Sequence, residues 1–209
     1  MLKHLFFDLD GTLVNSSKGI KNAFKYTFSK LDMPTPNEKI LSTFIGPPLE
    51  TTFSHFFDNT FQINQAITFF RDYYQEKGVH EVKLYDKIPL ALDILSQSYQ
   101  LFVTTSKHEP SAYQMLSELD VDDYFTAIYG STANRFVKED IIATCLNKHF
   151  IKPETAAIIG DTKFDMIGGK RQHINCIGVT WGFGKKDDLV KYGANTIITS
   201  PIDLINYLT

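Results

Sequence analysis

The chain has 209 residues, 43% hydrophobic and 22% charged, with a formal net charge of −3. This composition is typical of a globular protein, and the small negative charge gives no sign of the basic surface that binds nucleic acid or an anionic membrane. The two cysteines lie far apart, which argues against a disulfide framework or a zinc site. No apolar stretch approaches the roughly 18 residues of a membrane span, and the N-terminus lacks a signal-peptide pattern. We therefore expect a cytoplasmic protein with no nucleic-acid or membrane partner.

The first expected element is a buried strand that ends at two acids. Residues 5–7 form a continuous apolar run, as in a strand covered on both faces. Asp8 and Asp10 follow at the carboxyl end of this strand, where open α/β sheets bind their ligands. Two carboxylates this close repel each other, and a hard cation with oxygen ligands relieves the repulsion. The alternative is a plain Asp-Gly turn with an acid that caps the next helix.

The pattern is helical from residue 16 to about residue 78. Apolar residues recur at helical spacing over 17–31 and 61–77, and a turn at 45–50 starts a further helix. Pro34 and Pro36 are expected to end the first helix, and Gly78 the last. The many phenylalanines of this stretch predict the core of a small helical unit rather than an aromatic binding site.

Strands and helices then alternate. Helices are expected over 88–95, 110–119 and 138–149, and strands over 99–106, 127–130, 155–160, 175–180 and 196–198. Such alternation is typical of repeated β-α-β units. The predicted fold is therefore α/β, a doubly wound, Rossmann-like parallel sheet with helices on both faces, plus a small all-helical domain. The expected core domain comprises residues 1–15 and 83–209, and the helical domain residues 16–82.

Four polar motifs lie at the ends of successive strands or at the start of the next helix. They are Asp8 with Asp10, Thr105 with Ser106, Lys138, and the segment 160–165 that contains Asp161 and Asp165. In these motifs and their order, the whole chain resembles the haloacid dehalogenase-like hydrolases. The helical insert resembles the cap of the phosphoglycolate phosphatase-like subgroup, down to the sequence of residues 45–50. The proline that often follows the family's lysine is absent after Lys138, so that match rests on position.

The resemblance implies hydrolysis of a phosphate ester in two steps. Asp8 is the expected nucleophile and forms an aspartyl-phosphate. Asp10 is the expected acid that protonates the leaving alkoxide and the base that later activates water. The expected cofactor is Mg²⁺, held by Asp8, the backbone carbonyl of Asp10 and Asp161, with Asp165 joining or orienting this set.

The remaining motif residues are expected to bind the phosphoryl oxygens. Thr105 offers its hydroxyl group, and backbone N–H groups near Leu9, Asp10 and Ser106 offer further donors. Lys138 offsets the negative charge of the carboxylates and the phosphate. Residues beside the motifs are expected to be solvated at the rim of the site, namely Lys107, His108 and Lys163.

We therefore predict a Mg²⁺-dependent phosphomonoesterase, phosphoglycolate phosphatase-like, acting on a small soluble phosphate ester. The acid at Asp10 favours phosphoryl transfer over carbon–halogen cleavage, which has no alkoxide to protonate. A sugar-phosphate mutase of the same family is an alternative, although residues 16–78 show no basic cluster for a second phosphate. A phospho-accepting signalling module is another, but it does not need a helical insert. A binding protein that keeps the fold without turnover is a third, and the complete acidic set argues against it. Phosphoglycolate, a nucleotide, a sugar phosphate and pyrophosphate all stay open as substrates, and the sequence carries no signal for an oligomeric state.

Overall fold

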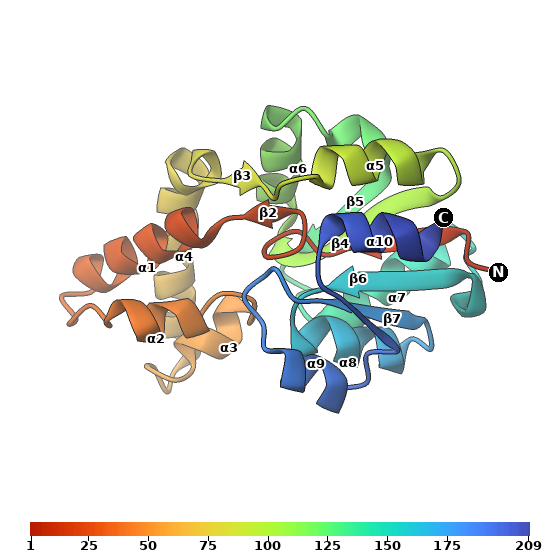
Figure 1. Cartoon of the computed structure of the whole chain (residues 1–209). Coiled ribbons are helices and arrows are strands. Elements are labelled where there is room, and N and C mark those ends of the chain that lie inside the picture. Colours follow the sequence, from red (N-terminus) through yellow and green to blue (C-terminus); the bar gives the residue numbers. More distant parts are fainter.

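A single sheet of six parallel strands forms the centre of the computed structural model, which describes residues 1–209 (Figure 1). The strand order is β5-β4-β1-β6-β7-β8, with β1 between β4 and β6. The strands have the bounds β1 (His4–Phe7), β4 (Gln100–His108), β5 (Phe125–Ser131), β6 (Ala156–Gly160), β7 (Asn175–Val179) and β8 (Thr196–Ile198). The β1 strand therefore brings its carboxyl end next to those of two other strands.

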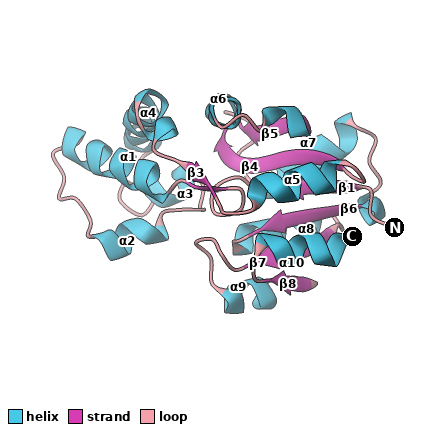
Figure 2. Ribbon diagram, turned by 45° about the horizontal axis from the view of Figure 1, so that its top comes forward, coloured by secondary structure: helices cyan, strands magenta, loops and turns pink.

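Helices cover both faces of the sheet (Figure 2). Successive side chains of β1 point to opposite faces, so Leu5 and Phe7 join one apolar cluster and Phe6 joins another. The first cluster is covered by α5 (Ile88–Ser96), α6 (Glu109–Glu118) and α10 (Pro201–Leu208). The second is covered by α7 (Lys138–Lys148), α8 (Lys163–Arg171) and α9 (Lys186–Lys191). Burial on both faces explains why these strands are continuous apolar runs.

The helices between residues 16 and 82 lie together beside the sheet, and we call this part of the chain the helical segment (Figure 1). Its rings pack around Phe24, whose centroid lies 5.0 Å from that of Phe44, 5.5 Å from that of Phe53 and 4.8 Å from that of Phe70. Two short antiparallel strands connect the segment to the rest of the chain. The bounds are β2 (Val14–Asn15), α1 (Ser17–Lys30), α2 (Glu38–Thr43), α3 (Leu49–Phe53), α4 (Thr60–Glu76), η1 (Gly78–His80) and β3 (Lys83–Leu84).

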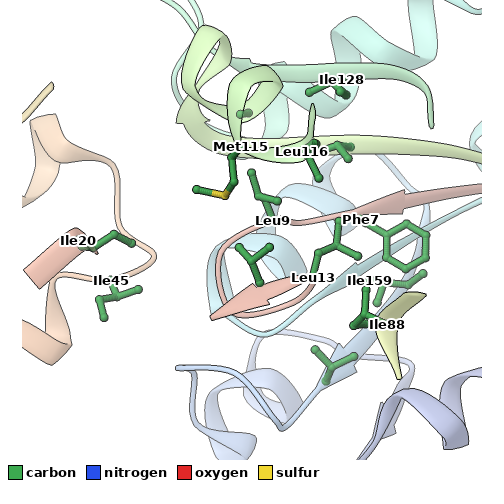
Figure 3. Packing of buried hydrophobic residues seen from close by; sticks show 14 of the residues in the cluster. Phe7, Leu9, Leu13, Ile20, Ile45, Ile88, Met115, Leu116, Ile128 and Ile159 are labelled. Atoms are coloured by element: carbon green, nitrogen blue, oxygen red, sulfur yellow. The ribbon is translucent and has the colours of Figure 1, made fainter. Parts of the chain in front are cut away.

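Figure 3 shows how the apolar side chains are distributed. Phe7, Leu13 and Ile159 lie close together at the sheet, whereas Ile20 and Ile45 belong to the helical segment. All five are buried. The apolar contacts thus continue from the sheet into the helical segment.

The predicted α/β class and the parallel sheet are confirmed. The first helix ends at Lys30, before the prolines, and α2, α10 and the β2–β3 pair were not predicted. Two further short 3₁₀ helices, η2 (Asp122–Tyr124) and η3 (Pro153–Thr155), precede β5 and β6. None of the helices combines the length and the apolar character that crossing a bilayer requires.

Candidate active site

The acidic motifs meet because their strands are neighbours. The backbone N–H of Asp8 donates to the carbonyl oxygen of Ile159 at 2.9 Å, which keeps the end of β1 in register with β6. Asp161 directly follows β6, and Asp165 lies in the first turn of α8. Carboxylate oxygens of these three aspartates lie within 4.8 Å of one another, and all three residues are buried.

Lys138 is the cation of this carboxylate cluster. The residue begins α7 and is 5% exposed. Its Nζ lies 2.7 Å from Asp8 Oδ1 and 2.8 Å from Asp165 Oδ1, and it donates to the Thr104 carbonyl oxygen at 2.8 Å. Two of these contacts are ion pairs with buried carboxylates, and the third is a hydrogen bond to the backbone. Lys138 therefore holds a fixed position between β4, β1 and α8.

Crowding of buried carboxylates raises their proton affinities. Burial, then the charge of Asp165, raises the pKa of Asp8 to about 6, although Lys138 opposes the rise. Burial and the charges of Asp165 and Asp8 raise the pKa of Asp161 well above its usual value. Burial lowers the pKa of Lys138, but the carboxylates of Asp165 and Asp8 outweigh this effect and raise it overall. The lysine therefore stays charged, whereas Asp8 and Asp161 are destabilised as anions.

A loop after β7 positions Asp161. The backbone N–H groups of Phe183 and Gly184 donate to its Oδ2 at 2.7 and 3.3 Å, and the Thr12 hydroxyl donates to its Oδ1 at 3.2 Å. Gly11 has φ +89°, and a Cβ there would overlap the Asp161 carboxylate. Glycine at position 11 is therefore needed both for the left-handed turn and for this close approach.

Asp165 bonds to both its own helix and Lys138. Its Oδ2 accepts the backbone N–H of Thr162 at 3.0 Å and the Thr162 hydroxyl at 2.8 Å. Its Oδ1 faces Lys138. From the first turn of α8, this carboxylate therefore orients Lys138.

Asp10 has a different partner. Its Oδ2 and Oδ1 accept from Lys107 Nζ at 3.0 and 3.2 Å, and the same Nζ donates to the Tyr74 hydroxyl at 2.9 Å. The Lys107 side chain is 7% exposed. The prediction that Lys107 is a solvated rim residue is thus wrong, because β4 continues to His108 and brings this lysine between β1 and α4.

A pocket opens between the strand ends and the helical segment. Asp8, Asp10, Thr105 and Ser106 line one part of it. The backbone N–H of Lys107 donates to the Thr105 hydroxyl at 3.2 Å, and the Ser106 hydroxyl is buried without a partner. The Leu9 carbonyl accepts the N–H groups of Leu13 and Val14, both at 3.0 Å, which forms the tight loop after β1.

The other part of the pocket carries polar groups of the helical segment. Arg71 of α4 lies 3.7 Å from Glu50 of α3, and its Nε is buried without a hydrogen-bond partner. His108 also lines this pocket, and burial together with the charge of Arg71 lowers its pKa. Apolar walls are supplied by α1, α4 and the loop before α3, at Ile20, Phe24, Phe44, Pro47, Leu49 and Phe70.

His108 and Lys163, predicted to be rim residues with Lys107, have different surroundings. His108 is partly buried at the pocket. Lys163 is also partly exposed, but its Nζ lies over the rings of Phe164 and Tyr192 at 5.3 and 5.8 Å from their centroids. Lys163 is not among the residues that line the pocket.

The carboxylate cluster fits a divalent metal ion. Three carboxylates against one ammonium leave two formal negative charges in a buried site. Carboxylate oxygens are ligands that suit Mg²⁺. The charge of a divalent ion would balance the site.

Several of these residues were not predicted from the sequence. Thr12, Phe183 and Gly184 hold Asp161, and Tyr74 and Arg71 bring groups of α4 to the pocket. One sequence signal was available for the loop after β7. Gly182 and Gly184, next to Trp181, indicate a place where the backbone can approach another segment closely, here Asp161. The contacts of Tyr74 and Arg71 join residues far apart in sequence, which no local pattern reports.

Comparison with known proteins gives concordant results. The family model described as haloacid dehalogenase-like hydrolase matches residues 5–179. A 5'-nucleotidase from Pseudomonas aeruginosa is 34% identical over 191 residues, 89% of this chain and 86% of that protein. A phosphoglycolate phosphatase from Aquifex aeolicus is 27% identical, over 99% of this chain and 97% of that protein. The structure of a haloacid dehalogenase-like family hydrolase from Streptococcus pneumoniae is 42% identical and superposes with a TM-score of 0.94, covering 100% of this chain and 99% of that one.

Proposed function

The chain belongs to the haloacid dehalogenase-like hydrolases, and we propose that it hydrolyses a small soluble phosphate ester through an aspartyl-phosphate on Asp8. As a member of this family with relatives named as phosphatases, it is a hydrolase of phosphoric monoesters. The observation that carries the proposal is Asp8 itself. It lines the pocket, its Oδ1 is paired with Lys138, and its Oδ2 has no partner.

Asp8 is the proposed nucleophile. In the first step its free oxygen attacks phosphorus, the bond to the ester oxygen breaks, and an aspartyl-phosphate forms. Lys138 fixes the other carboxylate oxygen, so the attacking group keeps one orientation. Positioning of this kind is the main contribution that a protein makes to phosphoryl transfer.

Asp10 is the proposed acid and base. It lines the same pocket, two residues from Asp8, and does not belong to the carboxylate cluster. A proton from Asp10 passes to the oxygen of the leaving alcohol in the first step. In the second step Asp10 takes a proton from the water that attacks phosphorus and releases phosphate.

Thr105, Ser106 and Lys138 are the proposed phosphoryl-binding groups, together with backbone N–H groups near Leu9 and Asp10. The buried Ser106 hydroxyl has no partner in the protein, and Thr105 lies beside it in the pocket wall. Buried polar groups are normally hydrogen-bonded, so an oxygen-rich group is a suitable occupant here.

Mg²⁺ is the proposed cofactor, held by Asp8, Asp161, Asp165 and the backbone carbonyl of Asp10. When bound, such an ion neutralises charge on the phosphoryl group and orients it. The hydrogen bonds from Thr12, Phe183 and Gly184 support this assignment, because they hold the Asp161 carboxylate in one orientation. Asp165 orients Lys138 in the same arrangement.

We propose that residues 16–82 act as a cap that selects the substrate, with residues 1–15 and 83–209 as the catalytic domain. Support comes from the pocket, whose wall includes α1, α4 and the loop before α3. Arg71 provides a cation there, and its buried Nε lacks an acceptor. We assign Arg71 to the part of the ester beyond the phosphoryl group. Closure of a cap also keeps bulk water from the site, with hinges at 14–16 and 82–86.

A panel of phosphate esters tests this proposal. Phosphate release is measured with Mg²⁺ and with a chelator, for the wild type, Asp8→Asn and the exposed control Asp93→Asn. The proposal expects Mg²⁺-dependent release that Asp8→Asn abolishes and Asp93→Asn retains. Release that survives in Asp8→Asn would overturn the nucleophile assignment.

A further inference from the structure

Lys107 makes three polar contacts at the site, although the proposed reaction assigns it no role. It lies near the end of β4, two residues after Thr105. Its Nζ donates to both oxygens of Asp10, at 3.0 and 3.2 Å, and to the Tyr74 hydroxyl at 2.9 Å. It also lies 4.0 Å from the centroid of the Tyr74 ring. The lysine therefore joins the strand end, the proposed acid and a helix of the helical segment.

These contacts restrict both side chains. A charge removed from water is costly unless it is paired and hydrogen-bonded, and Lys107 is only 7% exposed. Its Nζ has three N–H donors and three acceptors, namely the two Asp10 oxygens and the Tyr74 hydroxyl. Lys107 is the only side chain that bonds to the Asp10 carboxylate. The orientation of Asp10 is therefore set by Lys107.

We propose that Lys107 is a positioning residue that makes Asp10 an effective acid for the leaving alcohol. This inference rests on the proposed function. In the first step the bond from Asp8 to phosphorus forms, the bond from phosphorus to the ester oxygen breaks, and that oxygen takes the Asp10 proton. Asp10 is left as a carboxylate beside the Lys107 ammonium. A fixed cation at the place where negative charge develops stabilises the transition state.

Tyr74 ties this arrangement to the helical segment. It belongs to α4, is 3% exposed, and stacks on Phe70 with centroids 5.8 Å apart. Its hydroxyl reaches Lys107 only when α4 is seated against the strand end. Lys107 therefore holds Asp10 most rigidly when the helical segment covers the pocket, which couples the covering of the substrate to the orientation of the acid.

A comparison of two substrates that differ in their leaving group distinguishes this role from a merely structural one. Ethyl phosphate and acetyl phosphate are similar in size, but ethoxide needs a proton to leave, whereas acetate is a weak base and leaves as an anion. The quantity to compare is kcat/KM with Mg²⁺ present, because it reports the steps up to alcohol or acetate release and not the later hydrolysis of the aspartyl-phosphate.

Lys107→Met removes the ammonium and its charge and keeps most of the length of the side chain. We expect kcat/KM for ethyl phosphate to fall about 10- to 100-fold, within the contribution of general acid catalysis, and that for acetyl phosphate to change less than about threefold. Lys107→Arg retains a cation and should restore part of the loss. Tyr74→Phe keeps the ring and should give a smaller loss of the same kind. The matched controls are Tyr73→Phe on the same helix and Lys77→Met at its C-cap, both outside the pocket.

Three outcomes are distinguishable. A selective loss on ethyl phosphate in Lys107→Met supports the positioning role. An equal loss on both esters, or no loss on either, overturns it while the proposed function stands. A wild type that releases phosphate from neither ethyl phosphate nor any other ester of the panel contradicts the proposed function itself. Thermal melting of each variant verifies that it is folded.

Discussion

Lys138 Nζ lies 2.7 Å from Asp8 Oδ1, and both side chains are less than a tenth exposed. The ammonium is therefore the nearest positive charge to the proposed nucleophile. It is also shared with Asp165, 2.8 Å away, so one lysine balances charge on two buried acids. A substitution of this lysine should therefore change both the catalytic rate and the stability of the fold.

Lys138→Met should impair both properties. Removing one partner of a buried ion pair costs about 3–5 kcal/mol, and the loss of one preorganised charge costs about 10²–10³ in kcat. Urea denaturation and steady-state phosphate release measure the two effects. Lys148→Met, at the exposed end of the same helix, is the control and should change neither. An active Lys138→Met enzyme would show that this ammonium has no catalytic role.

Mg²⁺ should raise the melting temperature of the wild type. The carboxylate cluster has two uncompensated formal charges, and a ligand at 100 times its dissociation constant stabilises the folded state by about 2.7 kcal/mol. Asp161→Asn removes one of these charges and should reduce the Mg²⁺-induced shift. Calorimetry with and without the ion measures it. An equal shift in Asp161→Asn would place the ion elsewhere.

Arg71→Gln should change the choice of substrate more than the rate of chemistry. Phosphoglycolate and 2-hydroxyethyl phosphate differ in a carboxylate at the end that faces away from the phosphoryl group. If Arg71 contacts that end, its loss raises KM for phosphoglycolate by about tenfold, the effect of a charge-assisted hydrogen bond worth roughly 1.5 kcal/mol, and leaves KM for the hydroxyl ester nearly unchanged. Equal changes in KM for the two esters would contradict the assignment.

The core of the helical segment depends on Phe24. This ring is fully buried between Phe44, Phe53 and Phe70, and phenylalanine-to-alanine changes in cores cost about 3–5 kcal/mol. Phe24→Ala should therefore lower the free energy of unfolding by that amount. Phe61→Ala is the control, because Phe61 belongs to the same segment but is 77% exposed. A small loss in Phe24→Ala would mean that the segment repacks around the cavity.

Local sequence patterns were enough to predict most of the fold and the acidic motifs of the site. Asp8, Asp10 and Asp161 each end or closely follow an apolar run, and the parallel order of β4, β1 and β6 brings those ends together. Lys138 was identified by its place in the motif order, and the structure puts it against Asp8. Site residues that lie at the ends of neighbouring parallel strands can thus be predicted from a single sequence.

Contacts between distant segments were not readable in this way. A lysine beside a motif looks like a solvated residue, and only the seating of α4 shows that Lys107 is enclosed by Asp10 and Tyr74. Likewise, the N–H groups that hold Asp161 come from a loop 22 and 23 residues further along the chain. These contacts depend on tertiary packing, which amino-acid spacing does not encode.

Trapping of the intermediate tests the nucleophile assignment most directly. Borohydride reduces an aspartyl-phosphate to homoserine, so an enzyme quenched during turnover should contain homoserine at position 8 in its peptide map. With acetyl phosphate as substrate, acetate leaves without a proton, so Asp10→Asn should increase the yield because the base that activates water is absent. Asp8→Asn should give none. Rapid phosphate release without homoserine at position 8, or homoserine at another acid, would contradict the account.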